Sequence, residues 1–214
     1  MDRRLLLAAT TDHLRDSLVS AVLGRRIATT VCYDEAQQQP TLPAESSSGL
    51  DYILWRPASL LATRKVLAES EAFSHAIILC GPQRTDVPLH LMQTVAINRS
   101  IDASIKSLLI LVREVIGEFL RQGGGDLSIL WYDGGAEVLA PFDAAVAGAV
   151  RSLCESLFVF YEREPINIRG LHVSESEDTG VVDWVVQTIF DRGAKSDRRW
   201  SKRGGRGGVL AFGR

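Results

Sequence analysis

Residues 5–22 read LLLAATTDHLRDSLVSAV, an apolar run followed by a polar turn and an amphipathic segment. This order predicts a buried β-strand that leads into an α-helix, as at the start of a βαβ unit. Units of this kind that bind a dinucleotide place glycines in the turn, because glycine lets the backbone approach a pyrophosphate closely. Between Ala8 and Arg15 there is no glycine. The stretch therefore predicts the architecture and argues against a phosphate at its turn.

Short apolar runs alternate with helical patterns along the whole chain. The predicted strands are 4–9, 27–33, 51–55, 75–80, 127–132, 166–172 and 208–212. The predicted helices lie near 12–22, 58–70, 89–121, 142–162 and 181–191. Strands that are apolar throughout favour a parallel sheet covered on both faces. We therefore expect an α/β fold, a single Rossmann-like doubly wound domain of about seven strands over 1–214.

Composition limits the class of protein and the kind of site. The chain has 214 residues, of which 46% are hydrophobic, enough for one domain with a full core. Charged residues follow the first apolar run at once, which predicts neither a signal peptide nor a membrane span. The cysteines Cys32, Cys80 and Cys154 lie far apart, as expected of buried residues in a reducing, cytoplasmic compartment. The histidines show no metal-ligand spacing, so we expect no metal site.

The charge of the chain is unevenly distributed. Residues 192–214 hold eight Lys or Arg and one acid, whereas the net charge of the whole chain is −2. We predict a basic segment, 192–206, before a C-terminal strand at 208–212. Two RGG triplets suggest RNA binding, but the acidic body disfavours a nucleic-acid partner. The segment is better suited to contact an acidic partner surface or the phosphates of a substrate.

Two predicted helices carry more apolar surface than one face of a sheet can cover. The apolar residues of 98–121 recur at helical spacing and continue onto Ile110 and Leu111. The segment 142–162 has little polar face, and it ends with Phe158, Phe160 and Tyr161. These helices are expected to pack against a partner subunit as well as the sheet.

Four segments, taken in order, resemble the short-chain dehydrogenase/reductase family over nearly the whole chain. They are RPASLLATRKVLAES (56–70), DAAVAGAVRSLCESL (143–157), INIRGLHV (166–173) and GGVLAFG (207–213). The resemblance implies a Rossmann fold, a nicotinamide dinucleotide cofactor and a Ser-Tyr-Lys catalytic set. It also implies tetramers that form through the two long helices and through the last helix and strand.

The family's cofactor positions fall on residues that do not fit a dinucleotide. The turn pattern T-G-x-x-x-G-x-G falls on Ala8–Arg15, so that Ala9, His13 and Arg15 replace the glycines, and Asp12 adds a carboxylate. The adenine-binding aspartate falls on Ile53. The N-N-A-G turn falls on 79–82, which reads LCGP.

The family's catalytic positions are also replaced. The serine falls near Trp131 or Tyr132, the tyrosine on Leu139 and the lysine on Asp143. A leucine cannot donate a proton, and an aspartate reverses the charge that would lower the pKa of the tyrosine. The asparagine of the long helix falls on Ala96 or Asn98, the Pro-Gly turn falls on 173–174, and the substrate lid is shortened to ESEDTG, 175–180.

We therefore expect no catalytic, cofactor-binding or metal-binding residue and no cofactor. The resemblance extends to the inactive subunits of hetero-oligomeric members of the family. It implies a pseudoenzyme that stabilises or regulates an active short-chain alcohol or hydroxyacyl-CoA dehydrogenase subunit, in a tetramer like those of the family.

Alternatives remain open for the function and for single residues. The chain could be a homomeric scaffold or ligand-binding protein on the same fold, or an enzyme with a site relocated to Tyr132, Asp133 and Asp143. Thr11 and Asp12 are interpreted as an N-cap and a first-turn acid of the first helix. Arg15, with His13, could bind a different anion at that helix start.

Overall fold

The computed structural model describes residues 4–34, 49–83, 87–176, 179–190 and 200–204. Seven strands form one parallel sheet in the order β3-β2-β1-β4-β5-β6-β7. The strands are β1 (Arg4–Ala9), β2 (Ala28–Tyr33), β3 (Leu50–Leu54), β4 (His75–Cys80), β5 (Gly125–Tyr132), β6 (Ile166–Ser174) and β7 (Trp200–Gly204). The predicted doubly wound α/β fold is confirmed.

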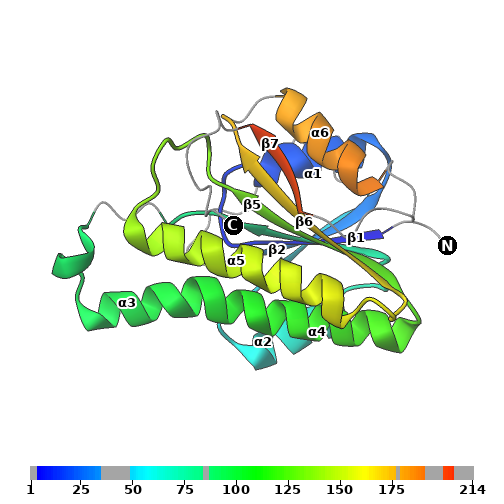
Figure 1. Ribbon diagram of the computed structural model, residues 1–214. Helices are drawn as coiled ribbons and strands as arrows, with labels where there is room; N and C mark the ends of the chain where they lie inside the picture. The colour runs from blue at the N-terminus through cyan, green and yellow to red at the C-terminus, as the bar shows by residue number, and fades with distance from the viewer. Residues whose placement is uncertain (1–3, 35–48, 84–86, 177–178, 191–199, 205–214) are drawn as a thin grey trace.

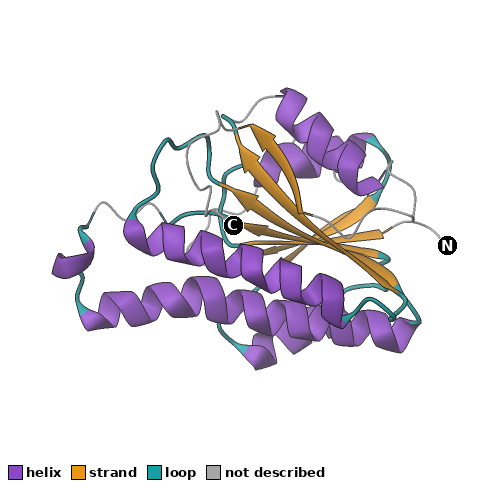
Figure 2. Cartoon of the chain, viewed as in Figure 1, coloured by secondary structure: helices purple, strands orange, loops and turns teal. Residues whose placement is uncertain are grey.

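Helices cover both faces of the sheet, as Figures 1 and 2 show. The α-helices are α1 (Arg15–Gly24), α2 (Leu60–Glu69), α3 (Thr94–Ile101), α4 (Ser107–Gln122), α5 (Pro141–Phe160) and α6 (Thr179–Phe190). Helices α2, α4 and α5 pack on one face, and α1 and α6 pack on the other. No helix in the described part of the chain is long and apolar enough to span a bilayer.

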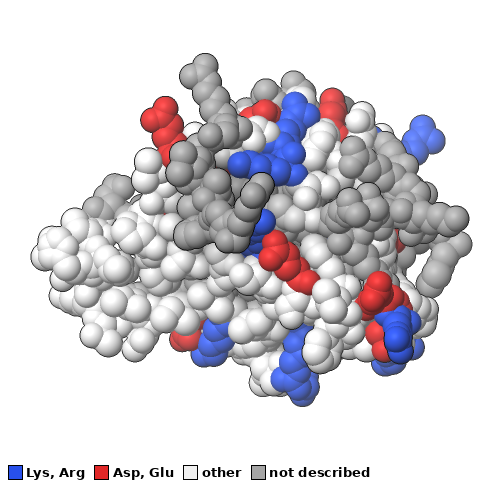
Figure 3. Space-filling view, in the orientation of Figure 1, with Lys and Arg blue, Asp and Glu red and all other residues white. Residues whose placement is uncertain are grey.

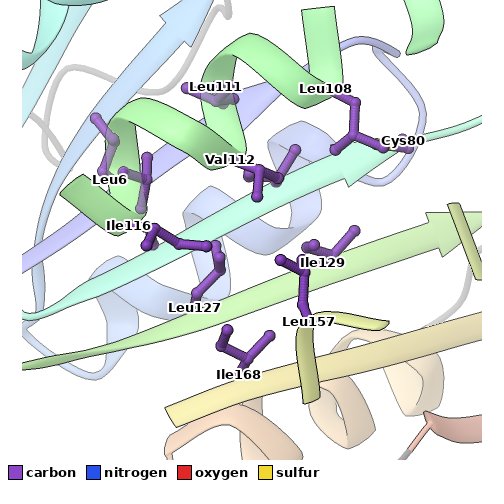
Figure 4. Packing of buried hydrophobic residues seen from close by; sticks show 14 of the residues in the cluster. Leu6, Cys80, Leu108, Leu111, Val112, Ile116, Leu127, Ile129, Leu157 and Ile168 are labelled. Carbon is purple, nitrogen blue, oxygen red and sulfur yellow. The ribbon is translucent and has the colours of Figure 1, made fainter. Parts of the chain in front are cut away.

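The core on the α4 and α5 face is built from the apolar stripes that the sequence pattern predicts. Leu108, Val112 and Ile116 of α4 point onto β4 and β5, where they meet Leu127 and Ile129 (Figure 4). Because both faces of the sheet are covered, most residues of the central strands β1, β4, β5 and β6 are buried. This burial explains why the sequence of these strands is mostly apolar.

The long helix predicted over 89–121 has a later start and an irregular turn. A short 3-10 helix, η2 (Leu89–Leu91), comes first, and the long helix begins at Thr94. A π-helical turn, η3 (Asp102–Lys106), joins α3 to α4. The long helix ends at Gln122, close to the predicted residue 121. Gly123 ends it with φ +86°, and Gly124 N donates a hydrogen bond to Phe119 O at 2.8 Å.

The structure places a strand within the basic segment 192–206, where none was predicted. Part of that segment, Trp200–Gly204, forms the edge strand β7 and pairs in parallel with β6. The Trp200 ring lies against Gly170, where a side chain would collide with it. An edge strand with one solvated face can be polar, which is why WSKRG lacks a strand pattern. The strand predicted at 208–212 lies outside the described residues.

Arg169 of β6 anchors the end of α6. Its guanidinium donates hydrogen bonds to Thr188 O, at 3.1 Å, and to Ile189 O, both in the last turn of α6. The carboxylate of Asp126 on β5 lies 3.7 Å away. The last carbonyl groups of a helix have no partner within the helix, so a buried arginine is well suited to satisfy them.

Candidate functional site

The order of the strands reverses between β1 and β4, and open α/β sheets bind ligands at the carboxyl ends of the strands at such a point. In this chain, Thr10 N donates a hydrogen bond to Leu79 O at 2.9 Å across that point. A Cβ on Gly81 would lie 3.2 Å from the Thr11 methyl and 2.9 Å from Tyr132 O. The segments that leave the two strands therefore pack closely against each other.

The turn between β1 and α1 is organised around Arg15. The side chain of Arg15, which the resemblance matches to the third glycine of the family pattern, is 2% exposed. Its Nη1 lies 2.8 Å from Asp12 Oδ1 and its Nε lies 2.8 Å from Asp16 Oδ1. Both carboxylates are about half-exposed. A buried guanidinium thus lies in the turn where a pyrophosphate would need open space beside the backbone.

The interpretation of Thr11 and Asp12 as an N-cap and a first-turn acid of the first helix is wrong. Helix α1 begins at Arg15, and its N-cap is Leu14, which makes no side-chain capping bond. Thr11 Oγ1 instead accepts a hydrogen bond from His13 N at 3.3 Å, and Asp12 pairs with Arg15. Leu14 has φ +65°, a left-handed conformation that costs a leucine energy and a glycine almost none. The turn therefore has a left-handed backbone conformation that favours glycine, but it carries large side chains.

Tyr52 of β3 lies close enough to Asp16 and Arg15 to be affected by their charges. Burial raises the pKa of its phenol, and the charge of Asp16 adds to this effect while that of Arg15 opposes it. The ring of Tyr33 meets that of Tyr52 edge to face at 6.3 Å. Ile53, at the adenine position of the family, packs into the core on the opposite face. The phenol ring of Tyr52 therefore lies near the charges of Arg15 and Asp16.

Large or apolar side chains are found at two positions that the resemblance matches to catalytic residues of the family. Trp131 of β5 is buried on the α5 face, and Leu139 is half-buried against the same core. Among the described residues, the indole N–H of Trp131 has no hydrogen-bond partner. Neither side chain carries an acidic proton that it could transfer at neutral pH.

Asp143, at the lysine position, makes a main-chain contact. It is buried in the first turn of α5, and its Oδ1 accepts a hydrogen bond from Gln83 N at 2.9 Å. The carboxylate therefore ties the start of α5 to the segment that follows β4. It lies in the first turn, where the helix dipole favours an acid.

A pair that the sequence analysis missed joins the ends of β5 and β6. His172 Nε2 lies 2.8 Å from Oδ2 of the buried Asp133, and Gly135 N donates to Oδ1 of Asp133 at 3.0 Å. Burial by itself would raise the pKa of Asp133. Hydrogen bonds from His172, Gly135 N and Ser174, with the charge of His172, outweigh burial and lower that pKa. In the sequence, Asp133 directly follows β5 and His172 lies two residues before the end of β6, but their pairing depends on the register of these two strands.

The structure does not bring together the relocated site of Tyr132, Asp133 and Asp143. Tyr132 packs into the core on the α1 and α6 face. Asp143 lies on α5, which covers the other face, and Asp133 pairs with His172. Within the described ranges, no three His, Cys, Asp or Glu residues are grouped as a metal site would need.

Solved structures similar to this chain share its whole architecture. A serine dehydrogenase from Escherichia coli has a TM-score of 0.73 at 15% identity, over 94% of this chain and 96% of that chain. The fold is that of the short-chain dehydrogenases/reductases. One such enzyme, from Vibrio parahaemolyticus, has a TM-score of 0.72 at 14% identity, over 94% of this chain and 100% of that chain. An acetoin dehydrogenase from Enterobacter cloacae has a TM-score of 0.77 at 10% identity, over 95% of this chain and 94% of that chain.

The likeness to these dehydrogenases concerns the fold alone, because the identities are low. No family model matches the sequence. No curated protein matches it either. What the chain does must therefore be argued from its own site residues.

Proposed function

We propose that this chain is a non-catalytic subunit with the short-chain dehydrogenase/reductase fold, which assembles with an active dehydrogenase of that fold. The observation that carries the proposal is Arg15, buried between Asp12 and Asp16 in the turn that would receive a dinucleotide. A pyrophosphate there would meet two carboxylates, and it would have to displace a guanidinium that already has charged partners. The cofactors NAD and NADP are therefore disfavoured at this turn.

The catalytic positions support the same proposal. Asp143 uses one carboxylate oxygen on Gln83 N, and Leu139 has no titratable group. An active enzyme of this family would need a tyrosine and a lysine at these two positions. Because this chain has neither, the partner subunit would supply the chemistry, on an alcohol or a hydroxyacyl-CoA.

The exposed helix faces support a role in assembly. Phe160 and Val159 at the end of α5 are 83% and 75% exposed, and Leu109 of α4 is 49% exposed. The surface over α3 and the first half of α5 carries few charged side chains on the face that Figure 3 shows. Large exposed apolar residues on long helices are typical of subunit interfaces. A partner of the same fold would present matching helices.

Native mass spectrometry of the protein purified from its own cells tests the proposal. We expect a complex of fixed stoichiometry with a chain that contains both TGxxxGxG and YxxxK. Finding the chain only with copies of itself would contradict the proposal and favour the homomeric scaffold. Finding it as a monomer with dehydrogenase activity would contradict both.

A pair of variants locates the interface. Phe160→Glu should abolish assembly because it places a charge in the apolar contact, and it should change the unfolding free energy by less than about 0.5 kcal/mol. Leu61→Glu is the matched control, since Leu61 is 80% exposed on α2. It should leave assembly intact. Equal effects of the two variants would show that α5 is not the contact.

A further inference from the structure

An open pocket lies between α2 and α4, at the amino-terminal end of the sheet. The turn between β1 and α1 lies at the opposite, carboxyl end of the strands. The volume of the pocket is about 810 Å³, and it is lined by residues of α2 and α4, by residues 70–73 before β4 and by Tyr161 after α5. This volume is within the range of about 300–1,000 Å³ that is typical of sites for small molecules. Helices α2 and α4 lie together on one side of the sheet in Figure 1.

The floor of the pocket is apolar, and it includes a glycine. Leu67, Phe73, Ile116 and Leu120 line it. Gly117 also lines it, in the middle of α4, although glycine is a poor helix former. A Cβ at Gly117 would meet no atom within 4 Å, so packing within the described chain does not require this glycine. The missing side chain leaves space for an apolar group from outside.

Two arginines at the pocket share one carboxylate. Arg64 Nε lies 2.9 Å from Glu114 Oε2, and Arg113 Nε lies 3.5 Å from Glu114 Oε1. Each guanidinium has five N–H donors, so one carboxylate cannot satisfy both. Both arginines are more than half exposed, which leaves their remaining donors accessible to a ligand.

The pocket is lined by three arginines and three glutamates, and the other two glutamates have arginine partners apart from Arg64 and Arg113. Arg121 is paired with Glu118, at 3.1 Å between Nε and Oε2. The third acid, Glu71, contacts Arg4, which does not line the pocket. The local charge at Arg64 and Arg113 is therefore positive.

We propose that this pocket binds an amphipathic anion, an apolar chain or ring that carries one carboxylate. The apolar part lies on the floor over Gly117, and the carboxylate takes the remaining donors of Arg64 and Arg113, since guanidinium groups bind carboxylates with two parallel hydrogen bonds. The proposal does not rest on the loss of cofactor binding, because the pocket is separate from the turn between β1 and α1.

An NMR titration of the full chain with octanoate tests the site. We expect saturable shifts of backbone amides in α2 and α4, with a dissociation constant on the order of 1 mM. Gly117→Leu should fill the floor and abolish these shifts. Gly117→Ala is the matched control, because it improves the helix in the same way but leaves most of the space. Saturable binding to Gly117→Leu equal to that of the original chain would overturn the proposal.

The head group is tested separately. Octan-1-ol, which has the same chain and no charge, should bind at least about tenfold more weakly than octanoate. Arg113→Gln should weaken octanoate binding about tenfold. Arg151→Gln, which removes an equally exposed arginine on α5, should not. Equal affinity for octanol and octanoate, or no saturable binding of octanoate, would refute recognition of an anion here.

Discussion

Arg15 and Arg169 are both buried arginines, but they lie at opposite edges of the sheet and are held in different ways. Arg15, at the carboxyl edge, is paired with Asp12 and Asp16, which are close in sequence and about half-exposed. Arg169, at the amino-terminal edge, binds main-chain carbonyls 19 and 20 residues away, in α6. Arg169 connects distant elements, whereas Arg15 fills a turn within one local segment.

The contrast indicates what each arginine contributes. The partners of Arg15 can return to water if the guanidinium is removed, because their carboxylates are already half-exposed. The carbonyls of α6 cannot do so easily, since the contacts that Arg169 makes with them are buried. An unsatisfied buried polar group costs more than a lost surface pair. Arg169 therefore stabilises the fold, and Arg15 mainly occupies space at the cofactor edge.

The largest effect is expected for Arg169→Met, which keeps the aliphatic stem but removes the hydrogen bonds to α6. The unfolding free energy should fall by about 3 kcal/mol, because buried carbonyl groups are left without donors. Urea denaturation measures this loss. Hydrogen exchange should show that protection is lost first in α6.

A matched control sharpens this result. Arg151→Met removes an exposed arginine that pairs with Glu155 on α5, and it should change stability by less than about 0.5 kcal/mol. If Arg169→Met were as mild as Arg151→Met, Arg169 would not anchor α6.

A smaller effect is expected for Asp133→Asn, which tests a third buried charge, one that joins two strands at the carboxyl edge. At pH 7 the loss should be about 2 kcal/mol, because the hydrogen bonds to the carboxylate are charge-assisted. The pKa of Asp133 is lowered in the folded state. Its contribution is therefore complete above the unfolded value of about 3.9 and is lost as the pH falls through the folded value.

The pH dependence of the stability difference between the original chain and Asp133→Asn tests this prediction. Urea denaturation at several pH values should give a gap between the original chain and Asp133→Asn that narrows below about pH 4. A gap that stays constant down to pH 3 would mean that the carboxylate of Asp133 is not held in its charged form.

The smallest effect is expected for Arg15→Met, at about 1 kcal/mol, because Asp12 and Asp16 are rehydrated when the guanidinium is gone. Denaturation in low and high salt measures it, and the difference should shrink in high salt because half-exposed ion pairs are screened. A loss as large as that of Arg169→Met would remove the contrast between the two edges.

Most of the fold could be predicted from the sequence, because the central strands β1, β4, β5 and β6 are largely buried and therefore mostly apolar. The edge strand β7 could not, since its contact with Gly170 depends on a ring packed across the sheet. At the carboxyl end of the strands, the sequence predicted that Arg15 would occupy the turn between β1 and α1. It did not predict the ion pairs of Arg15, or the pairing of Asp133 with His172, because these contacts depend on the backbone of the turn and on strand register.

Titration of the purified chain with NADH, followed by its intrinsic tryptophan fluorescence, tests the central claim most directly. Because Arg15 and its carboxylates lie where a pyrophosphate would bind, we predict no saturable change up to millimolar cofactor. Saturable binding at micromolar NADH that Arg15→Met alters would contradict the account.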